Sequence, residues 1–514
     1  MNGAESLMRT AVASGVELCL ANPGTTEMPL VAALDRVPGM RAVLGLFEGV
    51  CTGAADGYGR MTDRPALTLL HLGPGFANGI ANLHNARRAG APVVNVIGDH
   101  ATWHRAADAP LTSDIASLAR PVSAFVRETR RAGDLAADTA AAIEAALAPP
   151  GQVATLIVPA DCQWDESNAR DVRAARPEPL PSEPAAVERA ARALRDGPAA
   201  LLIGGPALRD RGLVAAARVQ SASGCRVFHD TFFARLERGG SLPSFERLPY
   251  FPEPAIQTLA DARQLVVAGT RDPVSFFGYP GVPSRLAPNG CVRTELARAG
   301  EEVVGALESL ADALGAPPTP PRVEPRARPG LPRTGALDVA ALGQALAALQ
   351  PEGAIVVDEG ATSGAAWFAH AAAAPRHTVL ALTGGAIGQG LPCAVGAALA
   401  CPDRKVIALQ ADGSGMYTLQ SLWTMARESL DVLVVICANR CYRILQLELA
   451  RAGHAEPGPQ ARRLVELVGP ELDWTALARG LGVPAARAAD AEGFAKELGR
   501  ALAEPGPALI EALL

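Results

Sequence analysis

Short apolar runs alternate along this chain with segments whose apolar residues recur at helical spacing. Near the N-terminus, residues 4–13 have helical spacing and lead into the apolar run 16–21. The same order recurs later, with a helix predicted over 337–349 and a strand over 354–357. Strands that alternate with helices in this way are typical of parallel sheets built from βαβ units. The pattern therefore predicts related, doubly wound α/β domains in the first and last parts of the chain.

Two proline-rich segments separate three blocks of the sequence. They are residues 176–184 (RPEPLPSEP) and 317–332 (PPTPPRVEPRARPGLP). Proline removes backbone donors and fixes φ, so these segments hold neither a helix nor a central strand. We therefore predict three domains, which comprise residues 1–175, 185–316 and 333–514.

The clearest βαβ unit lies near the C-terminal end. A strand is predicted over 406–410 and a helix over about 418–429, and the apolar run 432–438 forms a second strand. Asp412 follows the first strand and Asn439 follows the second. Parallel strands that are neighbours in an open α/β sheet end at the same edge, where ligands bind. We therefore expect the two side chains to lie close together.

These two side chains suggest a cation site. A carboxylate from Asp412, an amide oxygen from Asn439 and the main-chain carbonyl of Cys441 form an all-oxygen set that suits Mg²⁺. Gly413 and Ser414 add a turn without bulky side chains and a hydroxyl near a helix N-terminus, where N–H groups favour phosphate. For an isolated Asp-Gly-Ser, a turn without any ligand is the commoner interpretation.

A second group of candidate residues lies in the first block. Glu48 follows the predicted strand 43–47 and begins a helix of small residues. It could share a proton with a ligand nitrogen, or simply stabilise the helix N-terminus by roughly 0.3 to 1 kcal/mol. His71 lies in the predicted strand 66–72, and the glycine-rich sequence 73–79 is predicted to form a turn. A lone histidine at a strand end is more often structural than catalytic.

Composition limits the classes of function. The chain has 514 residues, 49% hydrophobic and 19% charged, with a net charge of -6. It has no basic cluster with interleaved aromatics, so we expect no nucleic-acid partner. It has neither a signal peptide nor an apolar run of membrane-spanning length, which predicts a cytoplasmic location without membrane contact. The nine cysteines are scattered and odd in number, which favours reduced thiols.

The motifs together resemble a known enzyme family. Asp-Gly-Ser at 412–414, followed by a helix, a strand and Asn439, resembles the fingerprint of thiamine diphosphate (ThDP) enzymes. In that fingerprint Gly-Asp-Gly-Ser precedes Asn-Asn; here Ala411 and Ala438 replace the first residue of each group. Residues 47–99 resemble the pyrimidine-binding domain of the family that includes acetolactate synthase, benzoylformate decarboxylase and pyruvate oxidase. The resemblance implies three doubly wound parallel-sheet domains: pyrimidine-binding, middle and diphosphate-binding.

The resemblance also implies roles for individual residues. Glu48 would bond N1′ of the aminopyrimidine, Gly385 would offer its carbonyl to the 4′-amino group, and Ile387 would hold the cofactor bent. Thr362 would bind the diphosphate, although helix capping by Thr362 or Ser363 is an alternative. The predicted catalytic residues are Glu48, His71 and Thr25. The predicted cofactor-binding residues are Glu48, Thr362, Gly385, Ile387, Gly413, Ser414 and Tyr442. The predicted metal ligands are Asp412, Asn439 and Cys441.

The implied activity is decarboxylation of a 2-oxo acid to an enamine that is ligated to a second carbonyl compound, as in acetolactate synthase. The alternatives are a simple decarboxylase like benzoylformate decarboxylase and a catalytically silent scaffold subunit. The cofactors implied are ThDP and Mg²⁺, and FAD in the middle domain has no specific support in the sequence. The family's cofactor lies between subunits, which implies a homodimer or homotetramer.

Two departures from the family bear on the substrates. Gly278 stands where benzoylformate decarboxylase has a second histidine. Ser275 stands near the position of an arginine in acetolactate synthases. These differences predict that the acceptor is an uncharged carbonyl compound rather than a second 2-oxo acid.

Overall fold

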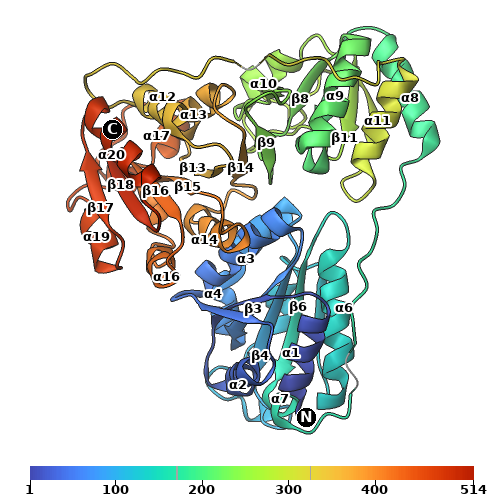
Figure 1. The fold of residues 1–514 in the computed structure, drawn as a ribbon, viewed down its shortest axis with the longest axis vertical. Coiled ribbons are helices and arrows are strands. Elements are labelled where there is room, and N and C mark those ends of the chain that lie inside the picture. Colours follow the sequence, from blue (N-terminus) through green and yellow to red (C-terminus); the bar gives the residue numbers. More distant parts are fainter. Residues whose placement is uncertain (170–171, 325) are drawn as a thin grey trace.

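The chain folds around three β-sheets, here called the N-terminal, middle and C-terminal sheets (Figure 1). The computed structural model describes residues 1–169, 172–324 and 326–514. Residues 170 and 171 of the first predicted domain, and residue 325 of the second predicted linker, lie outside the described residues. The predicted boundaries at 1–175, 185–316 and 333–514 stay a prediction.

The N-terminal sheet has six parallel strands in the order β2-β1-β3-β4-β6-β5. Its strands are β1 (Leu18–Asn22), β2 (Arg41–Leu44), β3 (Ala66–His71), β4 (Val93–Asp99), β5 (Phe125–Glu128) and β6 (Val153–Pro159). Its helices are α1 (Gly3–Ala13), α2 (Met28–Arg36), α3 (Glu48–Thr62), α4 (Leu72–Ala89), α5 (Ile115–Ala119), α6 (Leu135–Leu147) and α7 (Ala160–Trp164). Successive residues of β1 enter different cores: Leu18 and Leu20 pack with α3 and α4, and Cys19 packs with α1, α2 and α6. Helices therefore cover both faces.

The middle sheet has five parallel strands in the order β10-β8-β7-β11-β12. Its strands are β7 (Ala199–Ile203), β8 (Arg226–His229), β10 (Glu246–Arg247), β11 (Gln264–Ala268) and β12 (Val292–Ala297), and its helices are α8 (Pro184–Arg195), α9 (Asp210–Ser223), α10 (Pro252–Leu259) and α11 (Val303–Ala313). A Cβ on Gly204, in the turn after β7, would overlap Asp230 and Thr270. Because the chain's own side chains fill this turn, it adds no support for FAD.

The C-terminal sheet has seven strands in the order β17-β18-β16-β15-β13-β14-β9. Its strands are β13 (Ile355–Glu359), β14 (His377–Ala381), β15 (Val406–Ala411), β16 (Val432–Ala438), β17 (Ala485–Ala488) and β18 (Ala508–Leu513), with β9 (Leu236–Arg238) antiparallel at one edge. Its helices are α12 (Val339–Leu349), α13 (Gly364–Ala371), α14 (Gly390–Ala400), α15 (Asp412–Gly415), α16 (Ser421–Arg427), α17 (Arg443–Arg451), α18 (Pro459–Val465), α19 (Trp474–Gly480) and α20 (Ala491–Ala503). The predicted fold class is confirmed. The helix predicted over 418–429 is shorter than expected.

One prediction about local structure is wrong. Residues 73–79 form the first turns of α4 rather than a turn of irregular backbone. Glycine disfavours a helix interior by about 1 kcal/mol, but here close packing outweighs that cost. A Cβ on Gly79 would lie 2.8 Å from Thr52 Cγ2, and one on Gly75 would lie 3.0 Å from Glu48 Oε1. The glycines therefore allow α4 to approach α3. Although α4 has 18 residues, no helix in the described parts of the chain is long and apolar enough to cross a membrane.

Helix α3 of the N-terminal lobe packs directly against α14 of the C-terminal lobe (Figure 1). A Cβ on Gly396 would overlap the carbonyl oxygen of Ala54, and one on Gly57 would overlap the carbonyl of Cys393. The two backbones therefore touch across this contact. Side chains of both lobes, including Leu83 and Leu391, belong to one continuous apolar core.

We expect Gly396→Ala to lower the midpoint of thermal unfolding, because the new methyl group must displace backbone atoms of α3. Overpacking of this kind typically costs about 1 to 3 kcal/mol. Gly499→Ala is the matched control, since a Cβ there meets nothing within 4 Å in helix α20. The control should keep or raise the midpoint, because alanine favours helix formation. Circular dichroism during heating measures both variants; an unchanged midpoint in Gly396→Ala would contradict the close contact.

Candidate active site

Four neighbouring parallel strands of the C-terminal sheet, in the order β16-β15-β13-β14, end at the same edge. The predicted residues of the C-terminal block follow these four ends. Asn439 and Cys441 follow β16; Asp412, Gly413 and Ser414 follow β15; Thr362 follows β13; and Gly385 and Ile387 follow β14. The sheet topology thus brings this group together, as expected for ligand sites in open α/β sheets.

Asp412 is buried, with 3% of its surface exposed. Its carboxylate accepts hydrogen bonds from the N–H groups of Gly413 (2.8 Å) and Arg440 (2.7 Å). Burial raises the pKa of Asp412, and these two hydrogen bonds oppose the shift. Within the described residues no Arg, Lys or His forms an ion pair with Asp412, so a bound cation would supply the missing positive charge.

The donor set around Asp412 fits a hard cation. The amide oxygen of Asn439 accepts a hydrogen bond from the N–H of Cys441 at 3.1 Å, which orients the Asn439 side chain. No group of three or more His, Cys, Asp and Glu side chains converges in the part of the chain that the structure describes. A cation here would therefore depend on one carboxylate, one amide and one carbonyl, with the remaining ligands from water or phosphate, which is the usual pattern for Mg²⁺.

The turn after β15 is narrow. A Cβ on Gly413 would lie 2.5 Å from the ring of Tyr442, so only glycine fits there. The hydroxyl of Ser414 accepts a hydrogen bond from Gln410 Nε2 at 2.6 Å and donates to the carbonyl of Ala411 at 3.3 Å. Tyr442 and Gly413 therefore border the same space beside Asp412.

Thr362 lies in the turn between β13 and α13. Helix α13 begins at Gly364, and its N-cap residue, Ser363, makes no side-chain capping hydrogen bond. Helix capping by Thr362 or Ser363 is the alternative to diphosphate binding, and capping by the side chain of Ser363 is not observed. Burial of the neighbouring Asp358 raises the pKa of its carboxyl, which lies near Arg247.

The second group of predicted residues lies at the ends of three neighbouring strands, β2, β1 and β3. Glu48 is the first residue of α3 and is 9% exposed, and Asn78 Nδ2 donates to its Oε2 at 3.0 Å. His71 ends β3. Thr25 begins a short 3₁₀ segment after β1 and is exposed. The structure thus places these predicted residues at one edge of the N-terminal sheet.

The residues in contact with His71 are the neighbours of Thr25. Thr26 Oγ1 lies 3.3 Å from His71 Nδ1, and Glu27 Oε2 lies 2.8 Å from the same nitrogen. Glu27 was not among the residues predicted from the sequence. The only signal was its position in the Asn-Pro-Gly-Thr-Thr-Glu sequence after β1, and the burial of this carboxylate became apparent only in the fold.

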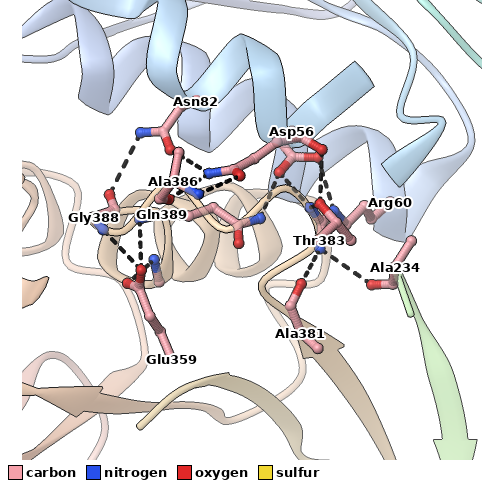
Figure 2. A network of polar contacts seen from close by, with 12 residues as sticks. Asp56, Arg60, Asn82, Ala234, Glu359, Ala381, Thr383, Ala386, Gly388 and Gln389 are labelled. Carbon is pink, nitrogen blue, oxygen red and sulfur yellow. Dashed lines mark hydrogen bonds and ion pairs between the residues drawn. The ribbon is translucent and has the colours of Figure 1, made fainter. Parts of the chain in front are cut away.

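The loop that carries Gly385 and Ile387 is held by helix α4. Asn85 Nδ2 donates to the carbonyl of Ala386 at 2.7 Å, and His84 Nε2 donates to the carbonyl of Gly384 at 3.1 Å. Asn82 Nδ2 donates to the carbonyl of Gly49, next to Glu48, at 2.9 Å, and lies 3.5 Å from the carbonyl oxygen of Gly388 (Figure 2). The loop therefore lies beside the first turn of α3, although no hydrogen bond of the described residues joins Glu48 directly to Gly385 or Asp412.

Figure 2 shows a buried ion pair that ties α3 to the same loop. Arg60 forms two hydrogen bonds with Asp56, at 2.7 and 2.8 Å, and both side chains are buried. Arg60 also donates to the carbonyl of Ala381 at 2.7 Å and to Thr383 Oγ1 at 3.0 Å, while Gln389 Nε2 donates to Asp56 at 2.6 Å. Both ends of the loop are thus fixed by one network.

An aromatic side chain from the middle block lies against Gly385. Gly385 has a φ of +78°, and a Cβ there would lie 2.7 Å from Phe276 Cζ. Phe276 packs on Phe232, Tyr250 and Phe277, with ring centroids 4.7 to 5.5 Å apart. The loop that contains Ser275 and Gly278 therefore meets the candidate site through an aromatic face.

Comparison with known families agrees with this geometry. The family model described as "Thiamine pyrophosphate enzyme, N-terminal TPP binding domain" matches residues 1–118, and its counterpart "C-terminal TPP binding domain" matches residues 358–512. Together the matched segments contain both groups of candidate residues. The chain belongs to the thiamine pyrophosphate enzyme family, and the predictions of this family and of an enzyme are confirmed.

Relatives within the family carry two kinds of name. The chain is 52% identical over 516 residues to the Mycobacterium tuberculosis protein named "Putative acetolactate synthase large subunit IlvX", covering 100% of this chain and 99% of the relative. It is 30% identical to benzoylformate decarboxylase of Pseudomonas aeruginosa, covering 97% and 96%. The solved structure of the Rhodococcus jostii ThDP-dependent 4-hydroxybenzoylformate decarboxylase superposes with a TM-score of 0.84 at 25% identity, covering 99% and 98%.

The position of Asp412 leads to a test with magnesium. We expect Asp412→Ala to weaken the binding of ThDP in the presence of Mg²⁺ by more than about 100-fold, because even the loss of an outer-shell partner typically costs 10 to 100-fold. Asp403→Ala is the control, since the exposed Asp403 precedes β15 at the opposite edge of the sheet. Isothermal titration calorimetry measures both variants. Unchanged affinity in Asp412→Ala would rule out this metal site.

Proposed function

We propose that this chain is a ThDP- and Mg²⁺-dependent enzyme that decarboxylates a 2-oxo acid and joins the remaining acyl unit to an uncharged carbonyl acceptor, in an acetolactate synthase-like reaction. Family membership supports the cofactor and the general chemistry. The proposal of an uncharged acceptor rests on the position of Phe276, because the aromatic ring that lies against Gly385 is apolar.

The residues at the edge of the C-terminal sheet would hold the diphosphate end of the cofactor. Asp412, Asn439 and the carbonyl of Cys441 would bind Mg²⁺, and the buried carboxylate of Asp412 has no other cationic partner among the described residues. Thr362, Gly413, Ser414 and Tyr442 would contact the diphosphate. When bound, ThDP supplies the nucleophilic carbon and the electron sink that decarboxylation needs.

Residues that follow strands of both the N-terminal and the C-terminal sheets would act at the other end of the cofactor. Glu48 would share a proton with N1′ of the aminopyrimidine, because its carboxyl is nearly buried. Among the described residues, Asn78 is the one side chain that forms a hydrogen bond with this carboxyl. Gly385 would accept a hydrogen bond at its carbonyl, and Ile387 would support the ring system. Burial of the Glu48 carboxyl excludes water, which strengthens its electrostatic contacts.

The substrate cavity has two different walls in this proposal. Thr25 and His71 would form a polar wall that contacts the carboxylate of the 2-oxo acid and transfers protons. Phe276 and Phe277, whose ring centroids lie 4.7 Å apart, would form an apolar wall. Ser275 Oγ donates to the carbonyl of Phe277 at 2.6 Å, so its hydroxyl is occupied within its own loop. An aldehyde or another uncharged acceptor suits this wall better than a second carboxylate does.

Simple decarboxylation is the second candidate, and one observation favours it. His71 is paired with the buried Glu27, so the chain has a well-ordered group for proton transfer. The relative from Pseudomonas aeruginosa that bears the decarboxylase name aligns over nearly the whole chain. The two candidates differ in product, and this difference can be measured.

We also propose that the enzyme is a homodimer or homotetramer. In this proposal the cofactor would lie between the pyrimidine-binding domain of one subunit and the diphosphate-binding domain of another, as the resemblance to the family implies. This arrangement would place Glu48 and Asp412 of one active site on different copies of the chain.

We expect Glu48→Gln to bind ThDP with nearly unchanged affinity and to exchange the C2 proton of bound ThDP for deuterium far more slowly. The reason is that the diphosphate and metal contacts at the other end supply most of the binding. Quenched-flow exchange followed by NMR of the released cofactor measures the rate. Glu17→Gln, an exposed glutamate of the same lobe, is the control. Equal exchange rates in Glu48→Gln and the parent would refute the role of Glu48.

The product distinguishes the two candidates. We expect a 2-oxo acid plus an aldehyde to give a 2-hydroxy ketone faster than the 2-oxo acid alone gives free aldehyde, because one proton donor is missing at Gly278. A Cβ on Gly278 meets nothing within 4 Å, so a histidine can begin there without a clash at its Cβ. General acid catalysis is typically worth about 10² to 10⁴-fold, so this variant should release more aldehyde.

Gly278→Asn is the matched control, since asparagine has similar size but does not transfer protons at neutral pH. Chromatography of the products measures each ratio. Free aldehyde as the main product of the parent, despite saturating acceptor, would favour the decarboxylase candidate.

A further inference from the structure

The side chain of Glu27 is completely buried behind His71. Its Oε2 accepts a hydrogen bond from the N–H of Gly24 at 2.8 Å and lies 2.8 Å from His71 Nδ1. Its Oε1 accepts a hydrogen bond from the hydroxyl of Thr26 at 2.5 Å. A buried carboxylate is costly unless it is paired and hydrogen-bonded, and Glu27 has one imidazole and two further donors.

Close packing fixes both partners of this pair. A Cβ on Gly24 would overlap the imidazole ring of His71, and a Cβ on Gly98 would overlap the carboxylate of Glu27. The backbone of the turn just after β1 and that of β4 thus lie directly against the two side chains. The pair is therefore closely packed where the neighbouring strands β1 and β3 end.

The contact determines which ring nitrogen of neutral His71 carries the proton. An ionised carboxylate only accepts hydrogen bonds, so Nδ1 must be the donor to Glu27. The tautomer of a histidine follows from the hydrogen bond that one nitrogen makes, and the other nitrogen then presents a lone pair. Among the described residues, no hydrogen-bond partner of His71 Nε2 is present. The imidazole is partly exposed, with 22% of the side chain accessible.

His71 lies close to Glu48 at this edge of the N-terminal sheet. A Cβ on Gly75 would lie 3.0 Å from Glu48 Oε1 and 3.3 Å from His71 Cβ, so these two side chains flank the same glycine. His71 is thus a neighbour of the carboxyl that would hold the pyrimidine end of the cofactor.

We infer that Glu27 is the positioning residue of His71: it holds the imidazole in the Nδ1–H tautomer and leaves Nε2 to exchange a proton with the substrate. The role of Nε2 in this inference rests on the proposed function. The assignment of the tautomer does not depend on that function. A carboxylate on the far nitrogen orients the histidine in the same way in other proton-transfer sites. Glu27 itself touches neither substrate nor cofactor.

A purely structural role for Glu27 predicts something different. Its bond to Gly24 N–H caps the 3₁₀ segment Thr25–Glu27 and would stabilise the turn whatever the state of His71. Loss of stability alone in a Glu27 variant would therefore not identify a positioning residue. The test needs a signal from the imidazole nitrogens.

Solid-state NMR of the full chain labelled with ¹⁵N-histidine gives that signal. The chain has eight histidines, and the resonances of His71 are those absent from His71→Asn. We expect neutral His71 in the parent to carry its proton on Nδ1, with Nε2 unprotonated. In Glu27→Gln the charged carboxylate that accepts from both Gly24 N–H and Nδ1–H is replaced by a neutral amide, so we expect the preference for Nδ1–H to weaken and a population with the proton on Nε2 to appear. A parent His71 protonated on Nε2 would overturn the inference without any variant.

Glu237→Gln is the matched control. Glu237 is also a buried glutamate, with 7% exposed, and its partners are Arg235 and Thr378 rather than a histidine. It should leave both nitrogen resonances of His71 unchanged. An equal effect of Glu237→Gln and Glu27→Gln on His71 would mean that general destabilisation, and not positioning, moves the proton.

Kinetics test the role of Nε2 in turnover of 2-oxo acids. We expect Glu27→Gln to lower kcat by about 10² to 10⁴-fold, the usual range for general acid–base catalysis, with a smaller change in KM. In the His71→Asn background the same substitution should cause no further loss, because its effect passes through His71. Additive losses in the double variant would contradict positioning. A parent without turnover of any 2-oxo acid would contradict the proposed function, and the tautomer would still decide the role of Glu27.

Discussion

The buried carboxylate of Glu359 holds the loop on which both groups of candidate residues depend. It accepts hydrogen bonds from the N–H groups of Gly388, Gln389 and Gly390 and from Gln410 Nε2, at 2.7 to 3.3 Å. Burial raises the pKa of Glu359, and these four donors oppose the shift. Each donor left unpaired in such a place would cost about 1 to 3 kcal/mol. Glu359 thus fixes the start of α14 and, with it, the position of Gly385.

The same loop connects the N-terminal and C-terminal lobes of one copy of the chain. Helix α14 packs against α3 through Gly396, and the Asp56–Arg60 pair of α3 contacts both ends of the loop. Any shift of α14 would therefore move Gly385 relative to the first turn of α3, where Glu48 lies. Buried ion pairs often contribute little net stability. What the contacts of this pair show is that α3 is joined to both ends of the loop.

The sequence predicted much of the framework and a smaller part of the site. Strands β15 and β16, which precede Asp412 and Asn439, have nearly the predicted bounds. Long apolar runs bounded by polar turns are a strong signal for a strand. The glycine-rich sequence after His71 was interpreted as a turn and is a helix, because its glycines serve contact with α3, which no local pattern reveals. Glu27, Asp56 and Glu359 were missed as site residues for the same reason: their partners are distant in sequence or become apparent only through burial. The contact between Phe276 and Gly385 could not be predicted, because it results from the packing of the middle block against the C-terminal block.

The proposed site for the metal and the diphosphate of ThDP is one edge of the C-terminal sheet. A crystal structure of the chain grown with ThDP and Mn²⁺ in place of Mg²⁺ tests this proposal most directly, since anomalous scattering locates the metal. We expect one peak within metal–oxygen bonding distance, about 2.0 to 2.3 Å, of the Asp412 carboxylate, the Asn439 amide oxygen and the Cys441 carbonyl. A metal bound elsewhere, or cofactor density away from the ends of β13, β15 and β16, would contradict it.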